Sequence, residues 1–153
     1  MGLRRGMIFR PARPTAVVLN GILAAFAFLG AARAANLTVE VHGVKPAEGA
    51  VRVALYAEPN GFRHEEHARS VLSVPASTPD VTVTFQDLLP GRYALIAYHD
   101  ENDDKKLDLR FGMFPREGWG LSNDPEIIGP PRFEPSAFDI GSVNTTVALS
   151  LHY

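Results

Sequence analysis

The chain contains no cysteine among its 153 residues. Disulfide bonds, thiolate metal ligands and a catalytic thiol are therefore excluded, and so is the cysteine-linked lipid anchor of a lipoprotein. A G-x-S-x-G nucleophile motif is absent as well. No apolar run reaches the roughly 20 residues that cross a bilayer, because the longest, Ala16 to Leu29, is interrupted at Asn20 and Gly21. The sequence offers no familiar catalytic constellation, and its longest apolar run is short for a transmembrane helix.

The first 34 residues have the layout of a secretory signal peptide. Arginines without any acid precede the apolar run, and small residues follow it, with Ala32-Arg33-Ala34 as the A-x-A cleavage site. An uncleaved anchor is the alternative, but the apolar run is short for one. We expect cleavage before Ala35, which leaves 35–153 as a single domain in the periplasm or outside the cell.

Removing this segment changes the net charge of the protein. The whole chain has 15 basic and 17 acidic residues, a formal net charge of −2. Five arginines and no acids lie in residues 1–34, so the mature domain has 10 − 17 = −7. Such a charge argues against nucleic acid and against anionic membrane surfaces as partners. We expect the partner to be an unknown small molecule or an envelope protein.

Alternation of apolar and polar residues predicts an all-β fold. Five segments alternate clearly, and two shorter ones are compatible with strands; in order they are 37–42, 51–56, 71–75, 81–85, 92–99, 138–140 and 147–151. We expect an antiparallel β-sandwich of about seven strands, prealbumin-like or immunoglobulin-like, with one long ordered loop. The simplest topology pairs the first two strands as a hairpin. One helical turn is expected near His64 to Ala68.

The segment 92–99 is apolar on both of its faces. Tyr93, Leu95 and Ala97 alternate with Ala94 and Ile96, which predicts a central strand covered on both sides.

A loop rich in carboxylates follows this strand directly. Its alternating oxygen-bearing side chains suit a hard cation, so the candidate metal ligands, here for Ca²⁺, are Asp100, Asn102, Asp104 and Asp108. The loop departs from an EF-hand because Lys105 stands where glycine is needed and Phe111 where glutamate is needed. The alternative interpretation is a solvated acidic turn.

The segment His64-Glu65-Glu66-His67 is a second candidate metal motif. It lacks the four-residue histidine spacing of a zincin helix and favours a solvated loop.

The stretch 111–135 has no periodicity, yet it is too apolar for disorder. It contains the only tryptophan, Trp119, and has glycine and proline at short intervals. Long loops of this kind in compact domains are often functional, although a lid that closes one end of the core is the alternative.

Several segments together resemble a family of small exported bacterial proteins, domain of unknown function 2141. The resemblance rests on YHDENDDKKLD, on GMFPREGWGLSND and on GPPRF, all within Tyr98 to Phe133. Asp103, Asp104 and Lys105 replace the Gly, Asn and Gly of the typical family motif. The resemblance implies a β-sandwich exported across the inner membrane, and it implies no activity. The candidate ligand-binding residues in these segments are His99, Glu117, Trp119, Ser122 and Asn123.

Three functions fit this sequence. The first is an exported, non-catalytic binding module with a Ca²⁺ site in the acidic loop. The second is a structural or adhesion-type envelope protein. The third, a hydrolase that uses His99 and Asp100 as base and acid, lacks a nucleophile and a second base at a recognisable spacing.

Overall fold

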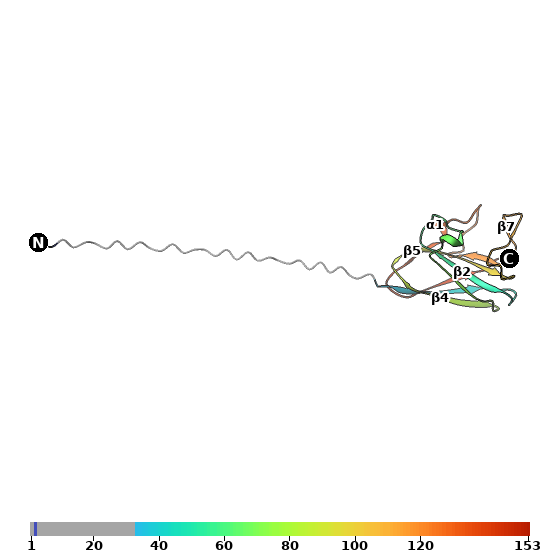
Figure 1. Ribbon diagram of the computed structural model, residues 1–153, viewed down its shortest axis with the longest axis horizontal. Coiled ribbons are helices and arrows are strands. Elements are labelled where there is room, and N and C mark those ends of the chain that lie inside the picture. The colour runs from blue at the N-terminus through green and yellow to red at the C-terminus, as the bar shows by residue number, and fades with distance from the viewer. Residues whose placement is uncertain (1, 3–32) are drawn as a thin grey trace. The chain divides into compact units, whose positions relative to one another are not determined.

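Two β-sheets carry the fold in a computed structural model that describes Gly2 and residues 33–153. The predicted signal peptide, residues 1–34, lies outside the described residues apart from Gly2, Arg33 and Ala34. The three-stranded sheet has the order β10 (Thr145–Ser150), β1 (Ala35–His42), β4 (Asp80–Leu88). The five-stranded sheet has the order β3 (Ser70–Pro75), β2 (Ala50–Tyr56), β5 (Gly91–Asp100), β8 (Trp119–Leu121), with β9 (Ala137–Ile140) beside β5. Figure 1 shows the sheets as layers, with the start of β1 at one end and β7 with the C-terminus at the other.

The core between the sheets follows from the alternation in the sequence. One face of β1 buries Leu37, Val39 and Val41, and the facing strands contribute Val53 and Leu55 among others. Each such side chain stabilises the fold by about 1.5–3 kcal/mol when fully buried. The all-β fold is therefore confirmed, and a single apolar core joins its two sheets.

Strand β5 lies in the middle of the five-stranded sheet, as predicted. It pairs with β2 along one side, and with β9 and β8 in succession along the other. Its inner face belongs to the core, while Ala94 and Ile96 on the outer face join a second apolar cluster with Phe62 and Phe133. That outer face is covered by the segment 57–69 and by the short helix α1 (Phe133–Ser136).

One feature of the predicted topology is wrong, and the antiparallel arrangement, which is otherwise confirmed, has one exception. Strands β1 and β2 do not form a hairpin, because β1 pairs with β10 and β4 whereas β2 pairs with β3 and β5. The sandwich is also not entirely antiparallel, since β1 and β10 run parallel, with Leu37 opposite Thr145. The expected helical turn is confirmed as the 3₁₀ helix η1 (Glu65–His67).

The stretch after the acidic loop is ordered, as predicted, but it contains short strands that its sequence pattern does not reveal. A small hairpin pairs β6 (Leu109–Arg110) with β7 (Phe114–Pro115), and β8 then joins the edge of the five-stranded sheet.

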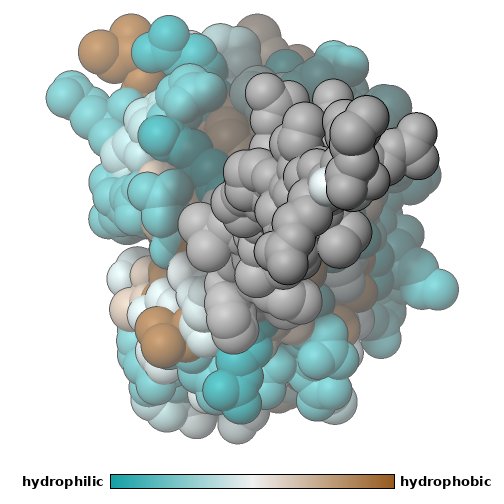
Figure 2. Space-filling view, turned by 90° about the vertical axis from the view of Figure 1, so that its left-hand side faces the viewer, coloured by the Kyte–Doolittle hydropathy of each residue, from teal (hydrophilic) through white to brown (hydrophobic). Residues whose placement is uncertain are grey.

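Within the described residues, no helix is long and apolar enough to cross a membrane. Seen from the end where β1 starts, the coloured surface is mainly hydrophilic with a few separate hydrophobic groups (Figure 2).

Candidate functional site

Asp100 ends strand β5 and is buried, although aspartate is usually exposed. One oxygen of its carboxylate accepts the backbone N–H of Asp104 at 3.0 Å, and the other accepts that of Lys105 at 2.9 Å. Hydrogen bonds to a charged acceptor each contribute about 1.5–3 kcal/mol. The carboxylate therefore folds the acidic loop back onto the end of the strand.

The other three candidate metal ligands are engaged in the same loop. Oδ1 of Asn102 accepts the N–H of Asp104 at 3.1 Å, and Oδ1 of Asp104 accepts that of Lys106 at 2.9 Å. The amide of Asn102 also donates to Asp108 at 3.4 Å. In the part of the chain that the structure describes, no group of three or more His, Cys, Asp or Glu side chains is arranged to hold a metal ion. The loop has the bonding of a carboxylate-stabilised turn, and calcium binding stays a prediction.

Glu117 closes the base of the acidic loop. Its side chain is buried, with one carboxylate oxygen accepting the N–H of Glu101 and the other that of Asp108, both at 2.9 Å. The backbone N–H of Arg116 donates to the carbonyl of Asp108 at 2.9 Å beside it. One side chain thus joins the two ends of the segment 101–108 and fixes where the β6–β7 hairpin begins.

His99 is fully buried and ties three segments together. Its Nε2 lies 2.7 Å from the carbonyl oxygen of Glu48, and its Nδ1 lies 3.0 Å from the hydroxyl of Tyr153. A carbonyl oxygen only accepts, so Nε2 is the donor to Glu48, and Nδ1 also lies 3.2 Å from the carbonyl oxygen of Lys45. The backbone N–H of His99 donates to Gly118 at 2.7 Å.

The bonding of His99 and Asp100 bears on the hydrolase interpretation. As neighbours on a strand, their side chains point to opposite faces of the sheet. The histidine contacts the 45–48 turn and the C-terminus, whereas the aspartate contacts the acidic loop. Both side chains are buried, so neither is placed to reach a substrate in this arrangement.

Ser122 and Asn123 fasten the end of the long loop. The hydroxyl of Ser122 accepts the N–H of Leu95 at 2.9 Å and donates to the carbonyl of Ser136. The amide of Asn123 donates to the carbonyl of Ala137 at 2.8 Å, from a backbone with a φ of +63° that asparagine tolerates well. These bonds join the chain after β8 to β5, to α1 and to the start of β9.

Trp119 is half-buried against the outer apolar cluster. Its backbone exchanges hydrogen bonds with His152, with N···O distances of 3.0 and 2.8 Å. The glycines on either side allow this close approach, since a Cβ at Gly118 would meet the ring of Tyr153 and one at Gly120 would meet the backbone of Ser150. The five candidate ligand-binding residues thus all have structural contacts, and a ligand role for them stays a prediction.

An ion-paired cluster secures segment 57–69 on the outer face. Glu65 of η1 pairs with the guanidinium of Arg52 and accepts the hydroxyl of Tyr98 at 2.9 Å. Burial and then the bond to Glu65 raise the pKa of Tyr98 above its ordinary value. Burial, with the nearby charges of Glu65 and Glu66, likewise raises the pKa of Tyr56 to about 12. Both phenols therefore stay protonated at neutral pH.

A pocket of about 720 Å³ lies where segments 59–64 and 131–135 meet. Buried Phe62 and Phe133 are among its lining residues, and their ring centroids are 5.7 Å apart in an edge-to-face arrangement. Arg63, His64 and Arg132 also line it. Clefts of roughly 300–1,000 Å³ with an apolar wall and a few polar groups are the usual form of small-molecule sites.

The backbone around this pocket is unusual. Arg63 has a φ of +84°, a region that costs energy for any residue with a side chain. The backbone at Gly61 packs closely on the side chain of His67. Only glycine fits there, because a Cβ at this position would lie 2.5 Å from that side chain. Glu134 also lines the pocket, and its carboxylate lies 3.4 Å from the guanidinium of Arg92 in an exposed ion pair.

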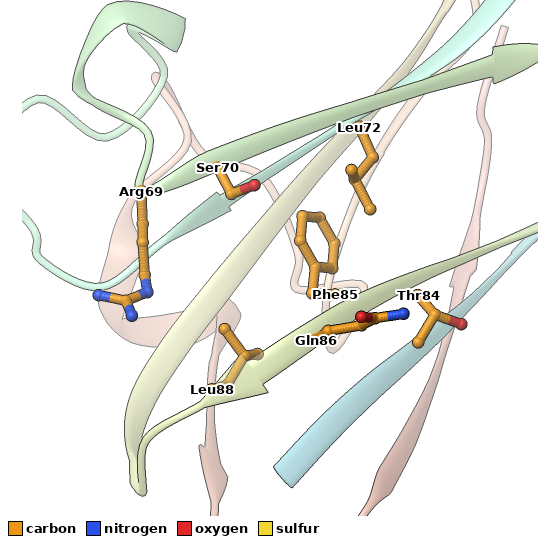
Figure 3. A pocket seen from close by; sticks show the side chains of 7 residues that line it. All are labelled: Arg69, Ser70, Leu72, Thr84, Phe85, Gln86 and Leu88. Carbon is orange, nitrogen blue, oxygen red and sulfur yellow. The ribbon is translucent and has the colours of Figure 1, made fainter. Parts of the chain in front are cut away.

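A second opening of about 480 Å³ lies between the edge strands β3 and β4. Figure 3 shows Leu72 and Phe85 pointing toward one another from the two strands, with Arg69 at the far end. Phe85 and Leu88 are buried core residues, so this opening is the unclosed edge of the sandwich. It carries one charged side chain, whereas the first pocket carries several.

Sequence reasoning missed the pocket at Phe62 and Phe133. Its two segments lie about 70 residues apart, and neither contains a binding motif. The one usable signal is that EPNGFRH and GPPRFEP each combine proline, phenylalanine and arginine.

Comparison with known proteins identifies the family. The family model described as "Uncharacterized protein conserved in bacteria (DUF2141)" matches residues 39–148, most of the domain. The chain therefore belongs to this family, as the resemblance of Tyr98 to Phe133 implied. No curated protein and no solved structure matches it.

Proposed function

We propose that this member of the DUF2141 family is an exported, non-catalytic binding module. Its ligand site is the pocket between segments 59–64 and 131–135. Export is supported by the signal-peptide layout of residues 1–34. The observation that carries the binding role is the pocket itself, in which a fixed aromatic wall meets Arg63, His64, Arg132 and the acidic Glu134.

The lining of the pocket defines a class of ligand. Phe62 and Phe133 are each 5 % exposed, and the small part of each ring that reaches the pocket suits an aromatic or aliphatic body. Arg63 and Arg132 present planar guanidinium groups, which bind carboxylate and phosphate groups in a bidentate manner. The ligand is therefore a small molecule that joins an apolar body to one anionic group.

The rigidity of the site also supports binding. Tyr56 packs edge-to-face on Phe62 with ring centroids 5.0 Å apart. On the other side of the pocket, the hydroxyl of Ser136 donates to the carbonyl of Arg132 at 3.1 Å. Fixing both walls before binding reduces the entropy that a ligand must overcome.

The test is thermal unfolding of the exported protein with benzoate, phenyl phosphate and inorganic phosphate. At 1 mM, a ligand with a Kd of ~0.1 mM stabilises the native state by about 1.4 kcal/mol, or about 5 °C in Tm. We expect a phenyl compound to raise Tm more than inorganic phosphate does. The double variant Arg63→Gln/Arg132→Gln should lose this response, and Arg116→Gln, outside the pocket, should keep it.

Two outcomes would count against the proposal. If none of the three compounds raises Tm, a structural or adhesion-type role in the envelope becomes the better account. If the double variant responds as the native protein does, the ligand binds elsewhere. Export has its own test, since mass spectrometry of the exported protein should find Ala35 at its N-terminus.

A further inference from the structure

The β6–β7 hairpin exposes an unusual concentration of apolar side chains. Phe111 is 79 % exposed, Met113 69 % and Phe114 62 %, and Leu109 is also exposed. Contiguous exposed apolar groups on a soluble domain mark a contact surface, whereas single ones need no explanation. These four occur within six consecutive residues, at the turn of the hairpin and directly beside it.

The turn at the tip places a phenylalanine where the backbone disfavours it. Phe111 and Gly112 have φ values of +56° and +69°, and the N–H of Met113 donates to the carbonyl of Arg110 at 3.2 Å. Three residues, 111–113, connect the two strands, and two successive positive φ values are the backbone that Asn-Gly adopts best in a hairpin turn. A bulky side chain in the left-handed region costs energy. Phe111 therefore makes the turn less stable while it puts an aromatic ring at the outermost point.

The charge of the hairpin differs from that of the rest of the domain. Residues 109–116 contain two arginines and no acid, although residues 35–153 have a net charge of −7. Lys105 and Lys106 precede it, while exposed Glu101, Asp103 and Asp104 lie earlier in the loop. The guanidinium of Arg110 lies 5.3 Å from the centroid of the Phe111 ring. Positive charge thus accompanies the apolar tip itself.

The hairpin also has a fixed base. Glu117 holds the backbone of Asp108 just before β6, and Arg116 just after β7 donates to the carbonyl of the same residue. Figure 1 shows β7 at the end of the sandwich away from the start of β1. The tip is therefore held at one end of the domain, clear of the sheets.

We propose that this tip inserts into the interface of an anionic phospholipid bilayer. Aromatic and long apolar side chains partition to the depth of the headgroups, and neighbouring arginines add attraction to anionic lipid. The net charge of the domain argues against an anionic surface, but screening limits that repulsion to about 8 Å at physiological salt. Arg110 is the charge nearest to the tip in the sequence, and Asp108 and Arg116 lie on either side of the base of the hairpin.

A bilayer fits this surface better than a protein partner does. A standard protein interface buries roughly 800 Å² on each partner, across a broad and closely fitting surface. A narrow tip of six residues is small beside such an area. Insertion into lipid needs no matching shape, only apolar side chains at the point of a rigid projection. This proposal is independent of the pocket at Phe62 and Phe133.

The test is flotation of the exported protein with vesicles, in chelator, after mass spectrometry has established its N-terminus. Vesicles of phosphatidylglycerol and phosphatidylcholine are compared with vesicles of phosphatidylcholine alone. We expect binding to the anionic vesicles and weaker binding to the neutral ones. Phe111→Asn should reduce the bound fraction about tenfold or more, because one aromatic anchor is lost.

The same variant separates a lost anchor from a lost fold. Asparagine suits the left-handed position, so Phe111→Asn should keep or raise the Tm while vesicle binding falls. Arg110→Gln should weaken binding to anionic vesicles selectively. The matched control is Ile128→Asn, because Ile128 is 85 % exposed and lies outside the hairpin; this variant should bind as the native protein does.

Several results would overturn the proposal. One is that the native protein does not float with the vesicles, and another is that Phe111→Asn binds as well as the native protein does. A third contrary result is a dimer in light scattering that Phe111→Asn abolishes, with no vesicle binding. That result would make the tip a contact between two copies of the chain.

Discussion

The hydroxyl of Tyr153 lies 3.0 Å from Nδ1 of buried His99, so a residue near the C-terminus completes the bonding of a strand in the middle of the sheet. The same hydroxyl accepts the backbone N–H of Lys45 at 2.7 Å. The end of the chain is thereby fastened to two segments that lie about 50 and 100 residues earlier.

Removing this hydroxyl should weaken the fold. Tyr153→Phe keeps the ring, but it removes the acceptor of the Lys45 N–H and one of the two partners of His99 Nδ1, the other being the carbonyl of Lys45. We expect a loss of about 1–2 kcal/mol in the free energy of unfolding. Urea unfolding measures it, with Val143→Ala, at an exposed position, as the control. An unchanged midpoint would show that water replaces the hydroxyl at no cost.

Glu117→Ala should release the acidic loop from its base. Two backbone N–H groups lose a charged acceptor, so we expect a loss of about 2–3 kcal/mol and faster trypsin cleavage after Lys105, Lys106 or Arg110. The matched control is Glu126→Ala, which removes an exposed carboxylate. Cleavage at the native rate would mean that the loop is held by other contacts.

Asp100→Ala distinguishes a carboxylate that folds the loop from one that binds calcium. If the carboxylate serves the two backbone N–H groups, the variant loses about 2–3 kcal/mol in chelator. Calcium binding predicts in addition that millimolar Ca²⁺ raises the Tm of the native protein and not that of the variant. Equal melting of native protein and variant in chelator would contradict the structural role.

Tyr56 should make stability depend on alkaline pH. Its pKa rises from about 10 in the unfolded chain to about 12 in the fold, so its contribution is complete below pH 10 and is lost between pH 10 and about 12. Between pH 8 and pH 11, the native protein should lose about 1 kcal/mol more than Tyr56→Phe does. Denaturant unfolding at both pH values measures the difference, and parallel losses would refute it.

The strands were predictable from sequence because burial imposes a two-residue period. Strand β5 shows this best, since its two apolar faces predicted a central position and the structure has one cluster on each. The partners of a strand were not predictable in the same way. The patterns of β1 and β2 fit a hairpin as well as opposite sheets, because alternation specifies which face is buried and not which strand lies alongside.

The acidic loop shows a different limit. Oxygens at alternating positions can surround a cation or accept backbone N–H groups within a turn, and the sequence pattern is the same for both. Burial decides between these uses, and Asp100 gave no sign of burial in the sequence. The role of Glu117 was hidden for a similar reason, because its two partners lie 16 and 9 residues away.

The parallel pairing of β1 with β10 bears on the order in which the domain can fold. Leu37 lies opposite Thr145, so about 110 residues separate the two strands of this ladder in the sequence. The ladder can form only once both strands are present. Contacts between such distant segments slow folding, because a long loop must close before they form. If the protein is exported as proposed, a chain that crosses a membrane from its N-terminus would lack the β1–β10 ladder until β10 arrives. Late pairing of this kind would suit passage through a narrow translocation channel as an extended polypeptide.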